Sequence, residues 1–360
     1  MYSLKMYSLD NSIREIFSDG LEKRGFYIFC PKYIVDVLSE EQKEIPLKVL
    51  KETVTMPWGA PYFSDVVVAA ANLLLQVESD RTLEFVEIWS EKQKENWLPV
   101  VGDDKKGVCL LARTAESIKN DDIRPAAIVC PGGAYMAVDF VKEGFLTAQE
   151  LEKAGYRVFI LRYRLLPNRY PCPQIDLALA IKYIRANADE YRIDANDLMA
   201  VGFSAGGHLT ASETLYASEI DDILMKELHT NYPELAAKYR GISVKANKLT
   251  LCYPVISLIE NTNELTRSSL TNEDESLIWK LSVELHADGT FPQTFVWAND
   301  DDPDVPPDNA GRLAKRLKEA GVNVCYRAYE SGGHGCGLGT GTSCEGWLDE
   351  MVRWMKNSEI

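Results

Sequence analysis

The sequence has few histidines, no closely paired cysteines and no apolar run long enough to cross a membrane. Four histidines occur in 360 residues, and the eight cysteines include no C-x-x-C pair. No H-E-x-x-H motif is present either, so the usual zinc ligand patterns are missing. The longest apolar stretch, residues 66–77, is interrupted by Asn72 and Gln76 and is too short to span a bilayer. We therefore predict no metal, no other cofactor and no membrane-spanning segment.

Positive charge is also scarce. The chain has 39 Lys and Arg against 54 Asp and Glu, giving a net charge of −15. This balance argues against nucleic acid, because such binding depends on neutralising phosphates, and against anionic membrane surfaces. The first ten residues lack the basic start and long apolar core of a signal peptide, and the cysteines are best interpreted as free thiols. These features predict a cytoplasmic protein.

The chain divides into two parts by pattern. Residues 1–81 contain helix-like segments and no strand alternation, which predicts a small helical N-terminal region. A cap, an interface and packing beneath the main domain are the alternatives for its role. The predicted helices of this region are residues 11–21, 31–38, 45–51 and 63–76. Residues 82–360 contain short apolar runs that alternate with amphipathic segments, which predicts a larger second domain. We find no internal repeat and no low-complexity tract.

Residues 82–360 have the pattern of an α/β domain. The predicted strands are residues 83–89, 108–112, 126–130, 157–163, 198–203, 248–253, 293–298 and 323–329. The predicted helices between them are residues 142–154, 174–190, 204–217, 307–320 and 346–356. This alternation indicates a mostly parallel sheet of about eight strands with helices on both faces. The first two strands fit an antiparallel edge hairpin. Two polar, partly helical inserts, residues 218–246 and 257–288, interrupt the alternation of strands and helices.

A G-x-S-x-G motif follows the run at residues 198–201 and precedes a helical segment. Its members are Gly202, Phe203, Ser204, Ala205 and Gly206. In this strand–turn–helix context the serine lies on a sharp turn, and the two glycines keep that turn free of colliding side chains. Ser204 would then project at a helix N-terminus, where a developing negative charge is favoured. The alternative is a plain glycine-rich turn.

A second glycine-rich turn closes the run at residues 126–130. It reads Cys130-Pro131-Gly132-Gly133-Ala134-Tyr135. Tetrahedral intermediates need N–H donors aimed at the oxyanion, which come from the residue after the nucleophile and from a glycine-rich loop after an earlier strand. We therefore predict an oxyanion hole formed by the backbone of Gly132, Gly133, Ala134 and Ala205. The alternative is again a simple Pro-Gly-Gly turn.

The general base and its acidic partner are predicted from loops near the C-terminus. His334 lies in a glycine-rich segment just after the last strand, whereas His208 is on the nucleophile helix and is expected to be structural. His229 and His286 lie in the polar inserts and are expected at the surface. The acid follows the strand at residues 293–298, where five aspartates are candidates: Asp300, Asp301, Asp302, Asp304 and Asp308.

Together these motifs resemble the acetyl esterase and acetylxylan-esterase-like (BD-FAE-like) branch of the α/β-hydrolases. The carriers are CPGGAY at Cys130, LRYRLLP at Leu161, YPCPQIDLALAIKYIR at Tyr170, GFSAGGHL at Gly202, YPVIS at Tyr253, FVWANDDDPDVPPDNA at Phe295 and SGGHGCGLG at Ser331. The resemblance implies an α/β-hydrolase fold and a Ser204–His334–Asp302 triad, since the acid of such proteins stands three residues before the Val of a D-x-x-V-P pattern. It covers residues 125–360 and leaves the helical N-terminal region without a counterpart.

The resemblance implies a serine esterase that hydrolyses short-chain, mainly acetyl, esters through an acyl-enzyme. An acetylated sugar or oligosaccharide is the implied substrate. A broad small-molecule carboxylesterase, an arylformamidase-like amidase and a peptidase are the enzymatic alternatives. A non-catalytic binding protein on a hydrolase scaffold is an alternative of a different class. The apolar faces of residues 11–21 and 63–76 also allow a homo-oligomer.

Overall fold

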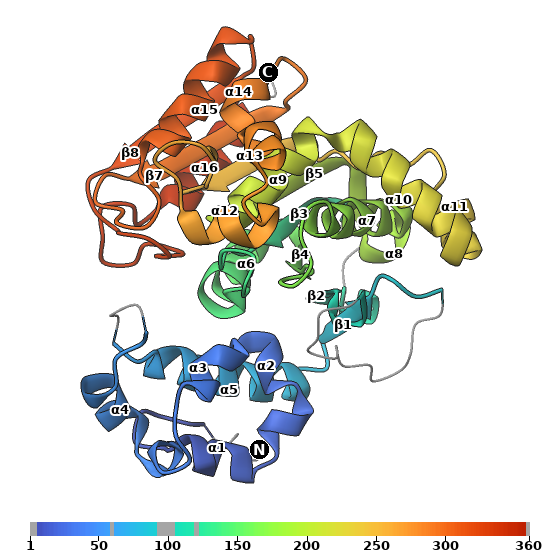
Figure 1. Ribbon diagram of the computed structural model, residues 1–360. Helices are drawn as coiled ribbons and strands as arrows, with labels where there is room; N and C mark the ends of the chain where they lie inside the picture. The colour runs from blue at the N-terminus through green and yellow to red at the C-terminus, as the bar shows by residue number, and fades with distance from the viewer. Residues whose placement is uncertain (1–5, 58–60, 92–104, 119–121, 358–360) are drawn as a thin grey trace.

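The computed structural model describes residues 6–57, 61–91, 105–118 and 122–357 (Figure 1). Its centre is an eight-stranded sheet with the strand order β1-β2-β4-β3-β5-β6-β7-β8. The strands are β1 (Leu83–Glu87), β2 (Cys109–Arg113), β3 (Arg124–Cys130), β4 (Arg157–Arg162), β5 (Ile193–Phe203), β6 (Lys248–Cys252), β7 (Gln293–Asn299) and β8 (Val324–Tyr329). Each predicted strand is present, with ends that shift by a few residues.

The sheet is parallel from β4 to β8 and antiparallel at one edge. β3 pairs in parallel with β4 and β5, and β6, β7 and β8 continue that direction. β1 and β2 form the antiparallel pair that the sequence predicted, and β2 also runs antiparallel to β4. Every residue from Leu198 to Phe203 in β5 is buried, so helices and loops cover both faces at the centre of the sheet. The prediction of a mostly parallel α/β sheet is confirmed.

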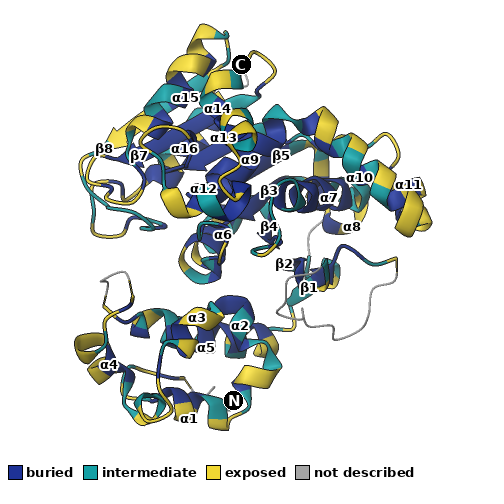
Figure 2. Ribbon diagram, viewed as in Figure 1, coloured by how far each residue is buried: buried dark blue, intermediate teal, exposed yellow. Residues whose placement is uncertain are grey.

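Helices cover the sheet. Those after β3 are α6 (Thr147–Lys153), α7 (Cys172–Ala186), α8 (Ala188–Tyr191), α9 (Ala205–Leu215), α10 (Ala217–Asn231), α11 (Pro233–Tyr239), α12 (Glu264–Thr271), α13 (Glu275–Leu281), α14 (Val283–His286), α15 (Asp308–Glu319) and α16 (Trp347–Asn357). α7 packs against α9, α10 and α11, while α15 packs on β7 and β8. The two polar inserts are helical, as expected, and contain α10–α11 and α12–α14. Figure 2 shows the buried residues concentrated along the sheet and the helix faces turned toward it.

One predicted helix has a different form. The segment predicted as an amphipathic helix at residues 142–154 begins as a π-helix, η5 (Phe140–Leu146), and continues as α6. The Asp139 side chain accepts the Lys142 N–H at the start of this segment. Gly144 lies inside it, and a Cβ there would be 3.1 Å from Cγ2 of Ile160 on β4. Glycine weakens an α-helix and here allows close packing on the sheet.

The N-terminal region is helical, as predicted, although residues 1–5 and 58–60 of it lie outside the described residues. Its α-helices are α1 (Ile13–Ser18), α2 (Phe26–Phe29), α3 (Lys32–Asp36), α4 (Leu47–Thr53) and α5 (Ser64–Ser79), with short 3₁₀ turns at Leu21–Arg24 and Gln42–Glu44. Figure 1 shows these helices grouped together on the side of β1 and α6. Phe29 of α2 packs against Phe85 of β1 and Phe140 of η5, with ring centroids 5.9 and 5.4 Å apart. The two parts of the chain therefore share one hydrophobic cluster.

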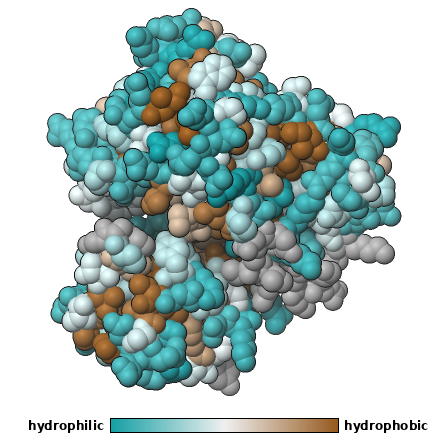
Figure 3. Space-filling view, in the orientation of Figure 1, coloured by the Kyte–Doolittle hydropathy of each residue, from teal (hydrophilic) through white to brown (hydrophobic). Residues whose placement is uncertain are grey.

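The surface is mostly hydrophilic on the face that Figure 3 shows. On the face shown in Figure 3, apolar side chains form separate patches rather than one continuous area. Large apolar side chains with exposed surface include Leu265, Trp279 and Leu285 of the second insert. Within the described ranges, no helix combines the length and the apolar character needed to cross a bilayer.

Candidate active site

Ser204 occupies the turn between β5 and α9. Its φ of +51° lies in the left-handed region, where a residue with a Cβ is strained. Gly202 and Gly206 flank it, and a Cβ on either would overlap backbone or side-chain atoms, among them the Gly206 carbonyl and the Cys130 carbonyl. Glycine is therefore required at both positions by close approach. The turn presents Ser204, only 6% exposed, at the N-terminus of α9.

His334 and Asp302 come to Ser204 from two neighbouring loops. His334 follows β8 and Asp302 follows β7, so both leave the carboxyl edge of the parallel strands, where β5 delivers Ser204. The His334 Nε2 lies 2.8 Å from the Ser204 Oγ, and the His334 Nδ1 lies 2.7 Å from the Asp302 Oδ2. The three predicted side chains thus form one continuous hydrogen-bonded series.

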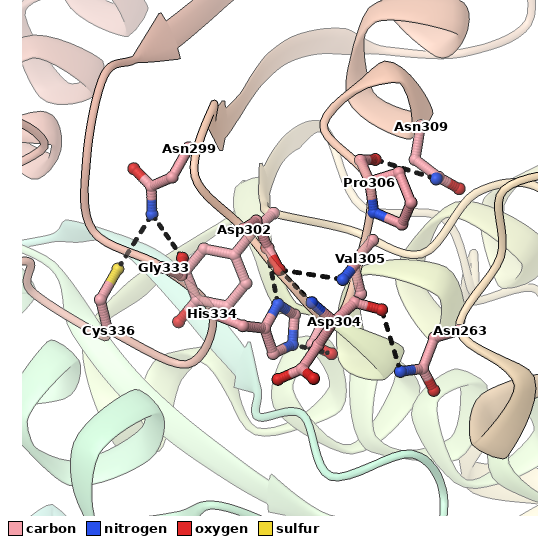
Figure 4. Close-up of polar contacts among 12 residues, drawn as sticks. Asn263, Asn299, Asp302, Asp304, Val305, Pro306, Asn309, Gly333, His334 and Cys336 are labelled. Atoms are coloured by element: carbon pink, nitrogen blue, oxygen red, sulfur yellow. Dashed lines mark hydrogen bonds and ion pairs between the residues drawn. The ribbon is translucent and has the colours of Figure 1, made fainter.

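Asp302 differs from the neighbouring aspartates in its burial. Asp302 is 8% exposed, whereas the other four candidate acids are exposed. Its Oδ1 accepts the N–H groups of Asp304 and Val305, both at 2.9 Å, while its Oδ2 faces the imidazole (Figure 4). Asp301 has a separate role, since its Oδ1 accepts the Gly333 N–H at 2.8 Å. Both oxygens of Asp302 therefore have donors, which holds the carboxylate in one orientation.

The environment of His334 favours its charged form. Burial alone lowers the pKa of His334, because the charged ring loses water. The hydrogen bond and charge of Asp302, with smaller contributions from the charges of Glu143 and Asp304, outweigh this and raise the pKa above its ordinary value. The raised pKa means that the site stabilises the protonated imidazole, and a general base needs this property when it takes up a proton.

The glycine-rich loop after β3 approaches Ser204 closely. A Cβ on Gly132 would lie 2.7 Å from the Ser204 Cβ. Gly133, Ala134 and Tyr135 all have positive φ angles, which fold the loop back toward the serine. Within the part of the chain that the structure describes, the N–H groups of Gly133, Ala134 and Ala205 have no protein acceptor. These three are free to bind an oxygen atom.

Gly132 does not match its predicted role as an oxyanion donor. Its N–H already donates to the buried Glu143 Oε2 at 2.6 Å. An N–H that points at a carboxylate is not available to a substrate oxygen, because it has one hydrogen to donate. Gly132 instead provides room for the close approach of the loop to Ser204. Sequence reasoning missed this because Glu143 lies in a segment whose pattern indicated only an amphipathic helix.

The other three histidines have structural or surface positions. His208 is fully buried on α9, where its ring nitrogens lie 2.9 Å from the Tyr135 hydroxyl and 2.9 Å from the Leu281 carbonyl oxygen. Burial lowers the pKa of His208 to about 4, so its ring is neutral. His229 is exposed on α10. His286 is partly exposed and contacts Trp279.

A family comparison identifies the chain. The sequence model of the BD-FAE family matches residues 116–317, which is more than half of the chain. The chain belongs to the BD-FAE family. The BD-FAE match includes Ser204, the glycine-rich loop and Asp302, and it ends before His334. Residues 1–81 lie outside the match.

Two curated relatives with a stated activity resemble this BD-FAE chain over 64% of its length. Endo-1,4-beta-xylanase B of Butyrivibrio fibrisolvens is 29% identical over 238 residues, which is 35% of that protein. An acetylxylan esterase of Xylanibacter ruminicola is 27% identical over 242 residues, which is 45% of that protein. The chain therefore spans less than half the length of these relatives.

Solved structures support the same assignment. An acetyl ester-xyloside bifunctional hydrolase from Caldicellulosiruptor lactoaceticus aligns with a TM-score of 0.63 and 26% identity, over 77% of this chain and 96% of that one. The carboxylesterase Cest-2923 from Lactobacillus plantarum aligns with a TM-score of 0.56 over 70% of this chain and 92% of its own, and at 22% identity it supports the fold alone. The BD-FAE chain thus shares the α/β-hydrolase fold of these structures.

Proposed function

We propose that the chain hydrolyses short-chain carboxylic esters, with Ser204 as nucleophile, His334 as general base and Asp302 as the acid of a triad. The observation that carries the proposal is the pair of short contacts made by His334, 2.8 Å to the Ser204 Oγ and 2.7 Å to the Asp302 Oδ2. Because an ionised carboxylate only accepts hydrogen bonds, the proton of the neutral imidazole stays on Nδ1. Nε2 is then unprotonated and accepts the Ser204 hydroxyl.

The first half-reaction transfers the acyl group to the enzyme. The Ser204 Oγ attacks the ester carbonyl carbon while its proton moves to the His334 Nε2. The carbonyl oxygen becomes an oxyanion, which the free N–H groups of Ala205, Gly133 and Ala134 stabilise. The bond from the carbonyl carbon to the alcohol oxygen then breaks, and the imidazolium returns its proton to that oxygen. The products are a free alcohol and an acyl ester on Ser204.

The second half-reaction releases the acid. A water molecule attacks the acyl carbonyl carbon while His334 takes one of its protons. The Ser204 Oγ is then the leaving group, and His334 returns the proton to it. Asp302 stays ionised through both halves and stabilises the positive imidazole. No step requires a cofactor.

An acetyl group on a sugar or oligosaccharide is the substrate class that the relatives suggest. They include an acetylxylan esterase and an acetyl ester-xyloside bifunctional hydrolase, and the chain covers 96% of the latter structure. We assign this chemistry to residues 82–360, since that range contains the proposed triad and the glycine-rich loop. The described part of the helical N-terminal region contacts this range through the packing of Phe29 on Phe140 of η5.

The test is a rate series with p-nitrophenyl acetate, butyrate and octanoate, alongside acetylated xylo-oligosaccharides, for the wild type and Ser204→Ala. We expect the acetate ester to be cleaved fastest and acetate to be released from the oligosaccharides, with both activities lost in Ser204→Ala. Cleavage of the p-nitrophenyl esters without acetate release would discard the sugar substrate and favour a broad carboxylesterase. Activity that survives in Ser204→Ala would remove Ser204 from the mechanism.

A further inference from the structure

A buried carboxyl group lies beside the candidate active site and belongs to none of the roles above. Glu143 is 2% exposed and sits in the π-helix η5. Its Oε2 accepts the Gly132 N–H at 2.6 Å, and its Oε1 lies 2.9 Å from the Tyr253 hydroxyl, which donates to it. One carboxyl group therefore joins the glycine-rich loop after β3 to the residue that follows β6.

Tyr253 extends this connection to the loop that carries His334. Its hydroxyl oxygen accepts the Gly337 N–H at 3.0 Å. Its ring packs edge-on against the His334 imidazole, with ring centroids 5.0 Å apart. The Gly337 carbonyl is held in turn by the Trp347 Nε1, at 3.0 Å. A buried series of hydrogen bonds thus runs from Gly132 through Glu143 and Tyr253 to the His334 loop.

Burial of Glu143 is costly, so a role in stability alone is a poor explanation of it. Burial and the nearby charge of Asp139 raise the pKa of Glu143 to about 7. Burying an ionisable group costs free energy relative to an apolar side chain of similar size, even where hydrogen bonds partly compensate for the lost water. Such groups are concentrated at functional sites. The position of Glu143 in a π-helix also favours a functional role, because π-helical turns are frequent at functional sites.

We propose that Glu143 is a positioning residue of the active site, which sets the distance between the oxyanion donors and His334. The proposal rests on the proposed function. Glu143 contacts no substrate and acts through its two partners. By holding the Gly132 N–H it fixes the peptide that precedes the Gly133 donor, and by holding Tyr253 it fixes the ring against which His334 packs. Displacements of about 1 Å in such groups reduce catalysis by roughly 100-fold.

The test compares variants that keep or remove the two hydrogen-bonding positions of Glu143. Glu143→Gln keeps an acceptor for Gly132 and a polar partner for Tyr253, so kcat should stay within about 10-fold of wild type. Glu143→Leu removes both, and kcat should fall about 100-fold with KM changed less than about threefold. A clearly higher kcat in Glu143→Gln than in Glu143→Leu separates positioning from a general loss of packing.

Glu213 provides the matched control. It is another buried glutamate, 1% exposed on α9, and burial raises its pKa to about 8. Its charge interacts with Lys245, Arg185 and Asp221, away from the triad. Glu213→Gln and Glu213→Leu should leave kcat within about threefold of wild type, and their melting temperatures measure the effect on stability of replacing a buried glutamate elsewhere in the fold. Equal losses of kcat at the two positions would overturn the proposal.

The pH profile gives a readout that a structural role would not move. The charge of Glu143 is one of the contributions that raise the pKa of His334. Removing the charge in Glu143→Gln lowers that pKa, so the acid limb of kcat/KM against pH should move to lower pH. The titratable groups facing Glu143 are Asp139 of its own segment and, from packed elements, Tyr163, Cys252, Tyr253 and His334. Burial keeps the tyrosines and the cysteine neutral.

A double-variant cycle tests the connection through Tyr253, and it serves if Glu143→Leu does not fold. Tyr253→Phe removes the hydroxyl that joins Glu143 to Gly337, and kcat should fall about 10-fold. In the double variant Glu143→Gln/Tyr253→Phe, the fold-loss of kcat should be smaller than the product of the two single losses. The reason is that both substitutions interrupt the same series of hydrogen bonds. Multiplicative losses, or a folded Glu143→Leu with kcat within threefold of wild type, would contradict the proposal. Inactive wild-type protein would instead contradict the proposed esterase function.

Discussion

Asp302 and His334 meet through a single carboxylate oxygen, with the Asp302 Oδ2 2.7 Å from the His334 Nδ1. The other oxygen, Oδ1, accepts two backbone N–H groups, from Asp304 and Val305. Figure 4 shows the carboxylate lying between the imidazole and this turn. The arrangement leaves the carboxylate no second orientation, so it specifies which nitrogen of His334 carries the proton.

Replacing Asp302 with Asn should move the proton of the neutral His334 ring from Nδ1 to Nε2. The Asn oxygen would remain with the two backbone N–H groups and its NH₂ group would face the His334 Nδ1, which must then be unprotonated. The proton moves to Nε2, which can no longer accept the Ser204 proton. We expect kcat for p-nitrophenyl acetate to fall by roughly 10³–10⁴-fold. Asp300→Asn, at an exposed neighbour, is the control and should stay near wild type. An Asp302→Asn enzyme with more than a tenth of the wild-type kcat would exclude the triad role.

The activity should have an acid limb set by His334. Only the neutral ring accepts the Ser204 proton, so the rate falls as pH decreases through the pKa of His334. The net effect of burial, Asp302 and the other carboxylates raises that pKa above its ordinary value of about 6.5. We expect the midpoint of kcat/KM, measured from pH 5 to 9 with p-nitrophenyl acetate, to lie above 6.5. A midpoint well below 6 would contradict the assignment of the base.

His208 should contribute to pH-dependent stability rather than to catalysis. Its folded pKa of about 4 is below the unfolded value of about 6.5, so the unfolded chain binds a proton first as pH falls. The free energy of unfolding should therefore decline between pH 6.5 and 4, by roughly 3 kcal/mol from this group. In His208→Gln the protein should be less stable at pH 8, and its further loss toward pH 4 should be smaller. Urea unfolding of the wild type and of His208→Gln at both pH values measures the free energy of unfolding. An equal decrease in that free energy between pH 8 and pH 4 in the two proteins would refute the prediction.

Adding a methyl group at Gly132 should separate the glycine-rich loop from Ser204. The new Cβ would lie 2.7 Å from the Ser204 Cβ and 2.9 Å from the Phe203 carbonyl oxygen, so the loop must move. We expect Gly132→Ala to lose about 100-fold or more in kcat. Gly311→Ala on α15 is the control, because the nearest atom to its Cβ would be 3.7 Å away. It should keep full activity, with stability raised by about 0.4–1 kcal/mol. Equal activity in both variants would show that the loop does not need its present position.

The features that could be predicted from sequence are those with local causes. Runs such as residues 198–203 and 248–253 are apolar and bounded by turn signals. The strands and their alternation with helices could therefore be predicted from the sequence. The elbow around Ser204 could be predicted because G-x-S-x-G is a short motif with a known strand–turn–helix context. The choice of Asp302 as the acid depended on the family pattern, since five aspartates follow the same strand and only their burial in the structure distinguishes them.

The features that could not be predicted depend on contacts between distant residues. Glu143 meets Gly132 across 11 positions and Tyr253 across 110, and no spacing rule connects these residues. The Gly132 N–H was therefore assigned to the oxyanion when it belongs to Glu143. The π-helical turn that carries Glu143 was also missed, because the apolar pattern of its segment is that of an ordinary amphipathic helix. The boundary between residues 1–81 and 82–360 stays a prediction.

The central claim is that Ser204 is an activated nucleophile, and reaction with a fluorophosphonate probe tests it most directly. Attack by the Ser204 Oγ expels fluoride and leaves a stable phosphonyl ester that mass spectrometry can locate. We predict one adduct per chain, on the peptide that contains Ser204, with no labelling of a folded Ser204→Ala protein. A folded wild-type protein that never labels, or a Ser204→Ala protein that labels equally well, would contradict the account and leave a hydrolase fold with a non-catalytic role.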